Sequence, residues 1–155
     1  GLVAGRQAHV PLLPDRVVDA QGRLRFHPGV EWTGGGLVTT PADLARWARA
    51  LYGGRAMPGG DADELVAGAL PVREGVAYGL GVFVYADTPL GPARGHGGWF
   101  PGYRSQMLWY PERRLAVAVQ LNVDGGVEPL EYTHAIARAL VDAGVGAGGR
   151  VAREP

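Results

Sequence analysis

The sequence predicts an α+β fold in which an antiparallel sheet of three to four strands is flanked by helices. Three observations support this prediction: a capped amphipathic helix begins near residue 41, the hydrophobic period changes to that of strands after Ala77, and an amphipathic helix returns near residue 130. The expected strands are joined by short turns, which favours an antiparallel meander because parallel strands need long crossover connections.

The first helix is expected from about Pro41 to Tyr52. Thr40 can cap it, Pro41 occupies the first helical position, and Asp43 completes a variant capping box. Gly53 and Gly54 follow its last turn. Its apolar face comes from residues at helical spacing, Leu44, Trp47, Ala48 and Leu51. Residues 61–70 are expected to form a second, short helix.

Four segments rich in valine, tyrosine and leucine are expected to be strands. They are Tyr78–Tyr85, Gly95–Gly98, Arg104–Tyr110 and Leu115–Asn122. The turn at residues 111–113 is short, so the last two strands should be hairpin partners. The final helix is expected from about Pro129 to Val141.

The chain is expected to be one domain over residues 1–142, followed by a flexible glycine-rich tail over residues 143–155. Residues 1–30 look like an extended lead-in with a weak hairpin around Gln21 and Gly22. The sequence begins at Gly1, which suggests a processed product or a piece of a longer chain.

Composition excludes several classes of function. Fifteen basic residues balance fifteen acidic ones, so no overall charge attracts nucleic acid or an anionic membrane. No apolar run approaches the roughly 18 residues of a membrane span. The absence of cysteine excludes disulfides and thiol nucleophiles. Glu131 and His134 form a single i, i+3 pair that is better explained by a surface helix, so neither a metal nor a cofactor is expected. Localisation is not predicted.

The run from Gly95 to Tyr103, Gly-His-Gly-Gly-Trp-Phe-Pro-Gly-Tyr, is the most informative segment. Acyl transfer through a serine needs an oxyanion hole of fixed backbone N–H donors, each worth about 2.7–4 kcal/mol. A strand edge supplies such a donor. Gly97 and Gly98 would let a substrate approach the backbone closely.

This run resembles the third signature of the serine β-lactamase and penicillin-binding protein superfamily, whose strand carries Lys-Thr-Gly or, in esterase-like and class C-like members, His-x-Gly. Other segments also resemble that superfamily: Gly35–Leu44, Tyr78–Gly81, and Tyr110–Pro111 with Val117–Asn122. The similarity covers about residues 30–142 and implies the C-terminal part of a bacterial β-lactamase-like hydrolase.

The resemblance implies roles for four residues. The Trp99 N–H would point at the oxyanion, and His96 would replace the superfamily's lysine, so both are candidate catalytic residues. His96 would bind a substrate carboxylate when protonated or donate a hydrogen bond when neutral. Gly97 and Gly98 would bind the substrate, a small-molecule amide or ester such as a β-lactam, a D-amino-acid peptide or a simple ester.

The superfamily's nucleophile is missing from this sequence. Its Ser-x-x-Lys element cannot occur because the chain has no lysine, and the one serine, Ser105, lies on an expected strand. We therefore expect a fragment that is catalytically inactive alone. By the resemblance, missing N-terminal strands would pair along Leu115–Asn122, and without them this edge would favour self-association.

Two alternatives accompany this interpretation. The chain could be a non-catalytic binding or assembly module derived from the same fold. His96-Gly97-Gly98 also resembles the oxyanion motif of α/β-hydrolases, but that fold needs a Gly-x-Ser-x-Gly elbow, which the sequence lacks, and a parallel sheet. Trp99 and Phe100 could equally be packing aromatics at a strand end.

Overall fold

The computed structural model describes residues 19–21, 23, 25, 27, 29, 32–35, 37–57, 62–100, 102–123 and 125–145. Most of the predicted lead-in, and the predicted tail beyond residue 145, lie outside the described residues. The elements follow in the order α2 (Pro41–Tyr52), α3 (Glu64–Ala67), β1 (Leu70–Arg73), β2 (Val76–Tyr78), β3 (Phe83–Tyr85), β4 (Ala93–Phe100), β5 (Tyr103–Tyr110), the 3₁₀ turn η3 (Pro111–Arg113), β6 (Leu115–Leu121) and α4 (Pro129–Asp142).

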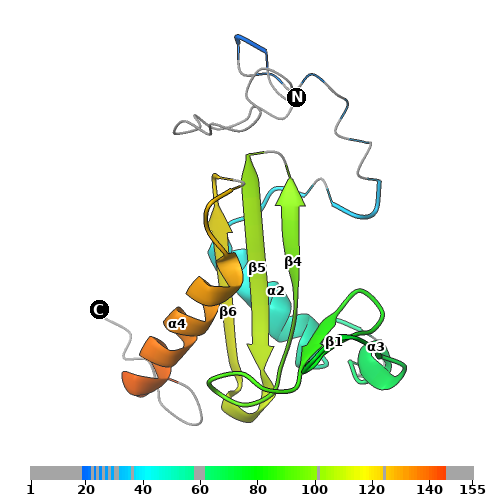
Figure 1. The fold of residues 1–155 in the computed structure, drawn as a ribbon, viewed down its shortest axis with the longest axis vertical. Coiled ribbons are helices and arrows are strands. Elements are labelled where there is room, and N and C mark those ends of the chain that lie inside the picture. Colours follow the sequence, from blue (N-terminus) through cyan, green and yellow to red (C-terminus); the bar gives the residue numbers. More distant parts are fainter. Residues whose placement is uncertain are drawn as a thin grey trace.

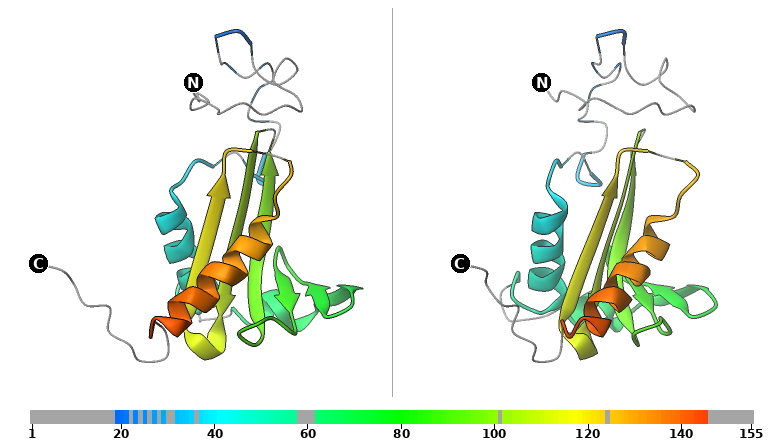
Figure 2. Two further views of the ribbon diagram at one scale, coloured as in Figure 1. Left: turned by 60° about the vertical axis from the view of Figure 1, so that its left-hand side comes forward. Right: turned by 90° about the vertical axis from the view of Figure 1, so that its left-hand side faces the viewer.

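The six strands form one antiparallel sheet in sequence order, from β1 at one end to β6 at the other. Helices α2 and α4 lie against opposite faces of its long strands (Figures 1 and 2). The α+β class and the antiparallel meander are therefore confirmed, and the sheet has six strands where three to four were expected.

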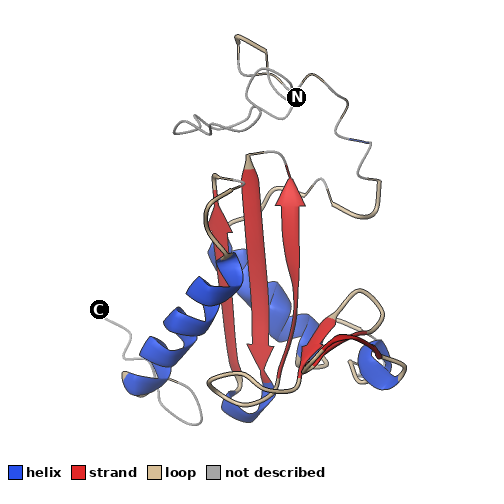
Figure 3. Cartoon of the chain, viewed as in Figure 1, coloured by secondary structure: helices blue, strands red, loops and turns tan. Residues whose placement is uncertain are grey.

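Two local features account for the additional strands. The expected strand Tyr78–Tyr85 is divided into β2 and β3, because a turn in which the Gly79 N–H donates to the Val82 carbonyl reverses the chain. Gly81 in this turn has φ of +69°, a conformation that glycine adopts without strain. The expected helix over residues 61–70 is reduced to the single turn α3 (Figure 3). Leu70, the last residue of the expected range, begins the edge strand β1.

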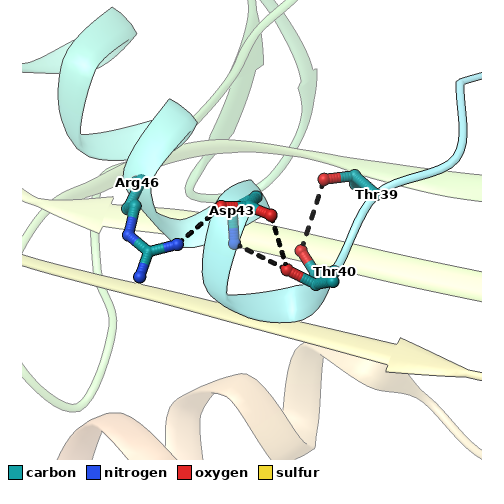
Figure 4. A network of polar contacts seen from close by, with 4 residues as sticks. All are labelled: Thr39, Thr40, Asp43 and Arg46. Atoms are coloured by element: carbon teal, nitrogen blue, oxygen red, sulfur yellow. Dashed lines mark hydrogen bonds and ion pairs between the residues drawn. The ribbon is translucent and has the colours of Figure 1, made fainter.

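Helix α2 has the predicted bounds and the predicted cap. The Thr40 hydroxyl accepts a hydrogen bond from the Asp43 N–H at 3.1 Å and donates to the Asp43 carboxylate at 2.8 Å (Figure 4). Arg46 pairs with the other carboxylate oxygen. The hydrogen bond from Thr40, followed by that from Arg46, holds the pKa of Asp43 below its ordinary value. The variant box thus uses the Thr40 side chain rather than its backbone N–H.

The hydrophobic core has two layers, one on each face of the sheet. Successive residues of β5 alternate between them, so Leu108 and Tyr110 pack toward α4 while Trp109 packs toward α2. The layer toward α4 comprises Tyr85, Ala93, Leu108, Tyr110, Leu115, Val117 and Ala137. The layer toward α2 comprises Ala48, Tyr52, Val82 and Trp109. Residues of β5 and β6 contribute to both layers.

Strand β6 forms the far end of the sheet. It pairs with β5 in continuous register from Tyr110↔Leu115 to Arg104↔Leu121, and the predicted hairpin is confirmed. Its sequence, LAVAVQL, contains no charge and no proline. Natural edge strands are usually protected by such residues or by bulges. The outer edge of β6 therefore has the properties of a strand that pairs further.

Candidate active site

The glycine run lies on β4, and only part of that strand has partners on both sides. Toward β5, pairing continues along the strand to Phe100↔Tyr103. Toward β3, pairing covers only Ala93 to Gly95. Among the described residues, the ladder with β3 ends at Gly95 and does not extend to the stretch from His96 to Trp99.

The register determines which backbone groups face this open edge. Phe100 and Tyr103 oppose each other across a two-residue connection, a geometry in which the two residues exchange both ladder hydrogen bonds. Bonded and non-bonded pairs alternate along an antiparallel ladder, so Trp99↔Arg104 is a non-bonded pair. The N–H and C=O of Trp99, and likewise those of Gly97, point away from β5 and toward the open edge.

A cavity of about 500 Å³ adjoins the same stretch. Gly97, Gly98 and Trp99 line it, and the Trp99 side chain is 59% exposed. Its other lining residues come from β1, β3, β5 and the start of α4, and they are Val72, Arg73, Phe83, Tyr85, Arg104, Ser105, Gln106, Glu128, Pro129 and Leu130. Three of the four sequence-predicted site residues thus meet at one concavity.

His96 lies beside this cavity and does not line it. Its Nε2 atom is 2.9 Å from the Tyr78 hydroxyl. Its ring also packs against Phe83, with centroids 5.4 Å apart, and Phe83 is a lining residue. By register His96 is opposite Met107, on the sheet face that α2 covers. The ring is therefore held beside the open edge, in contact with a residue that lines the cavity.

The structure gives a packing reason for both central glycines. A Cβ atom on Gly97 would lie 2.8 Å from Oε1 of Gln106, and one on Gly98 would lie 2.5 Å from the Ser105 hydroxyl oxygen. Both distances are shorter than real Cβ contacts, so a larger residue at either position would require the end of a β5 side chain to shift. Sequence reasoning attributed these glycines to substrate approach alone, because the contacts depend on strand register.

A second polar group at the cavity was missed by sequence reasoning. Arg104 donates to both carboxylate oxygens of Glu128, at 2.8 and 3.0 Å, and to the Val127 carbonyl at 2.6 Å. The hydrogen bonds from Arg104 lower the pKa of Glu128. The two residues are 24 positions apart, and no local pattern connects them. The pair joins β5 to the residue that precedes α4.

Tyr85 and Gln106 add neutral polar groups to the cavity wall. Gln106 is almost completely buried, and its amide donates to the Met107 carbonyl at 3.3 Å. Burial raises the pKa of Tyr85, against the opposing effects of Arg73 and of a hydrogen bond with Gln106. The wall therefore combines hydrogen-bonding groups with aromatic surface, which suits a small polar organic ligand.

Among the described residues, no group of three His, Cys, Asp or Glu side chains is arranged to hold a metal ion. No described helix has the length and apolarity to cross a membrane.

Comparison with known proteins identifies the fold. The D-amino acid amidase from Ochrobactrum anthropi SV3, complexed with D-phenylalanine, matches with a TM-score of 0.58 and 24% identity over 76% of this chain and 40% of that one. This similarity shows a shared fold. The chain thus carries part of a serine-hydrolase-type fold.

Two further solved structures match at lower TM-scores. A D-stereospecific amidohydrolase from Streptomyces sp. matches with a TM-score of 0.47 and 28% identity over 54% of this chain and 25% of that chain. SurE matches with a TM-score of 0.47 and 25% identity over 77% of this chain and 28% of that chain. The chain therefore spans between a quarter and two fifths of the length of these structures. No curated protein matches significantly.

The Beta-lactamase family model matches residues 3–141. That range is most of the chain, so the chain belongs to the Beta-lactamase family.

Proposed function

We propose that this chain is the C-terminal segment of a serine hydrolase that cleaves an amide or ester through an acyl-serine intermediate, and that it is inactive alone. The observation that carries the proposal is the unpaired edge of β4, where the register directs the Trp99 N–H outward beside a cavity lined by the same residues. The family membership supports the reaction class.

The proposed chemistry follows from that edge. When a serine attacks the substrate carbonyl, negative charge develops on the carbonyl oxygen, and a fixed backbone donor stabilises it by about 2.7–4 kcal/mol. The Trp99 N–H is such a donor, since β4 is paired with β5 from Arg94 to Phe100. The glycines at 97 and 98 add no side chain of their own to the backbone next to it. His96, held nearby, would contact the substrate.

Inactivity is proposed because the chain supplies no activated nucleophile. The chain has no lysine to act as the family's base. The Ser105 hydroxyl packs over Gly98 in the middle of the sheet. Serine is inert without a neighbouring proton acceptor, and no described residue forms a hydrogen bond that would activate Ser105. A polypeptide carrying Ser-x-x-Lys would have to supply both groups.

The outer edge of β6 is the proposed site for that polypeptide. Its seven residues are apolar or neutral, with α2 and α4 on either face. An added strand would satisfy the free backbone groups of β6, as in other cases of strand addition. In the absence of an N-terminal catalytic segment, a second copy of the chain would use the same edge.

The test is reconstitution. Purified chain should show no turnover of nitrocefin or of p-nitrophenyl esters, and turnover of either by the chain alone would contradict the proposal of inactivity. Mixing with a separately produced polypeptide that carries a Ser-x-x-Lys segment of the family should give a covalent adduct with a fluorescent penicillin or a fluorophosphonate probe.

The matched control replaces the serine of the added polypeptide by alanine, which should abolish the adduct. Lack of an adduct with both versions, despite stable association, would favour the alternative of a non-catalytic binding or assembly module.

A further inference from the structure

The hydrogen bond between Tyr78 and His96 carries a further inference, which rests on the proposed function for its role toward substrate. The two side chains come from different strands, β2 and β4, and the tyrosine oxygen is 2.9 Å from Nε2 of the histidine. No other described residue forms a hydrogen bond with this ring. Tyr78 therefore determines what the histidine offers to a ligand.

Tyr78 is itself held firmly. Its ring packs against Phe83 with centroids 4.5 Å apart, and the two residues are register partners in the β2–β3 ladder. The His96 ring lies 5.8 Å from the Tyr78 ring and 5.4 Å from that of Phe83. Three rings thus fix one another, so the hydroxyl stays aimed at the same imidazole nitrogen.

Chemistry decides the direction of this hydrogen bond when the histidine is neutral. A phenol O–H is a more acidic donor than an imidazole N–H, and an imidazole nitrogen is a more basic acceptor than a phenol oxygen. The stronger arrangement is therefore O–H of Tyr78 donating to Nε2 of His96. The ring proton must then be on Nδ1.

We infer that Tyr78 is a positioning residue that holds His96 in the Nδ1–H tautomer, so that the histidine presents a hydrogen-bond donor to substrate whether or not it is charged. When the ring is protonated, Nε2–H donates to the Tyr78 oxygen and Nδ1 keeps its proton. The donor at Nδ1 suits a carbonyl or carboxylate oxygen of the substrate. The same donor persists across the pH range in which histidine changes its charge.

The test measures the tautomer directly on the ¹⁵N-labelled chain, using long-range ¹H–¹⁵N correlation spectra of the histidine rings near neutral pH. The His96 signals are identified by their loss in His96→Gln. In the unaltered chain Nδ1 should carry the proton and Nε2 should not. In Tyr78→Phe this preference should disappear, and Nε2–H should become substantially populated.

Tyr110→Phe is the matched control, because the Tyr110 hydroxyl lies 2.8 Å from Nδ1 of His134. This variant should change the His134 signals and leave those of His96 as they were. The inference is overturned if neutral His96 carries its proton on Nε2 in the unaltered chain, or if Tyr78→Phe folds and leaves the Nδ1–H tautomer in place. The unaltered chain decides the first point even if a variant fails to fold.

These spectra require neither a nucleophile nor a substrate, so the inference and the proposed function fail separately. Loss of the Nδ1–H preference would leave the oxyanion proposal standing. Failure of reconstitution would remove the proposed role of His96 toward substrate, and the Nδ1–H tautomer of His96 would still stand as a property of the chain.

Discussion

Individual contacts across β4 and β5 explain why the glycine run has its sequence. Gln106 and Ser105 lie over Gly97 and Gly98, and each would collide with an added methyl group. The same glycines leave the backbone of the run exposed to the cavity. One residue type thus satisfies two requirements, and only the packing requirement can be measured in the isolated chain.

We expect Gly98→Ala to lower the free energy of unfolding by about 0.5–1.5 kcal/mol, the cost of moving the Ser105 hydroxyl away from its preferred position. In a Ser105→Ala background the cost should fall, because the colliding oxygen is gone and the Ser105 Cβ is 3.9 Å away. Urea denaturation of the four proteins in this double-mutant cycle measures the coupling.

Gly68→Ala serves as the control, since nothing lies within 4 Å of an added Cβ and φ is −112°. It should change stability by no more than about 0.5 kcal/mol. Equal costs of Gly98→Ala in both backgrounds would show that the hydroxyl contact does not explain the glycine.

The site residues could be named from the sequence because the run is local and glycine-dense. Their environment could not. The cross-strand collisions, the Tyr78 hydrogen bond and the Arg104–Glu128 pair all join residues that come together only through register or through the start of α4. The catalytic role of His96 and Trp99 and the substrate-binding role of the two glycines stay predictions.

Among the elements, the junction of β5 and the start of α4 contains an ion pair between Arg104 and Glu128. Glu128 is the residue at the N-terminal cap of α4, and Arg104 is the second residue of β5. The Glu128 side chain does not cap the helix, because both of its carboxylate oxygens accept hydrogen bonds from Arg104 of β5. Loss of this pair should loosen the helix start without disturbing the core.

We expect Glu128→Gln to lower the thermal midpoint at neutral pH by a small amount, since the pair is partly exposed. The pKa of Glu128 is lowered in the folded chain, so its contribution is complete above the ordinary glutamate value and is lost as pH falls through the lowered value. The difference between the two proteins should therefore shrink on acidification.

Thermal unfolding between neutral and acidic pH measures this difference. Glu74→Gln, in the β1–β2 turn, has no ion pair among the described residues and should track the unaltered chain throughout. A difference for Glu128→Gln that stays constant with pH would contradict the electrostatic explanation.

Elements with strong local sequence signals were predictable from the sequence, and elements with weak or conflicting signals were not. Helix α2 has the predicted bounds, and β5, β6 and α4 differ from prediction by a residue or so at an end, because each has clear periodicity and a capping or turn signal. Strand β1 was missed because its four residues include Pro71 and follow directly on a helix-like segment. The Gly79–Val82 turn was missed inside an otherwise strand-like run.

At the scale of the whole molecule, the unprotected edge of β6 should make the chain associate. We expect concentration-dependent self-association of the purified chain, measured by sedimentation velocity. Gln120→Lys places a charge on β6 and should weaken it, because lysine on an edge strand opposes further pairing.

Gln21→Lys makes the same change at an exposed position away from the sheet and should not weaken association. A chain that stays monomeric at all concentrations, or that responds equally to both variants, would argue against the β6 edge as the contact. Replacement of the self-associated species by a one-to-one complex with an added Ser-x-x-Lys polypeptide would identify that polypeptide as the competing occupant.

The strand order has a consequence for how quickly the chain can reach its native state. Every ladder from β1 to β6 joins neighbours in sequence, so each pairing closes a short loop and needs no distant segment to arrive first. Folding rates rise as the mean sequence separation of contacting residues falls. The meander should therefore assemble by successive hairpin closure and refold faster than β-sandwiches of similar size.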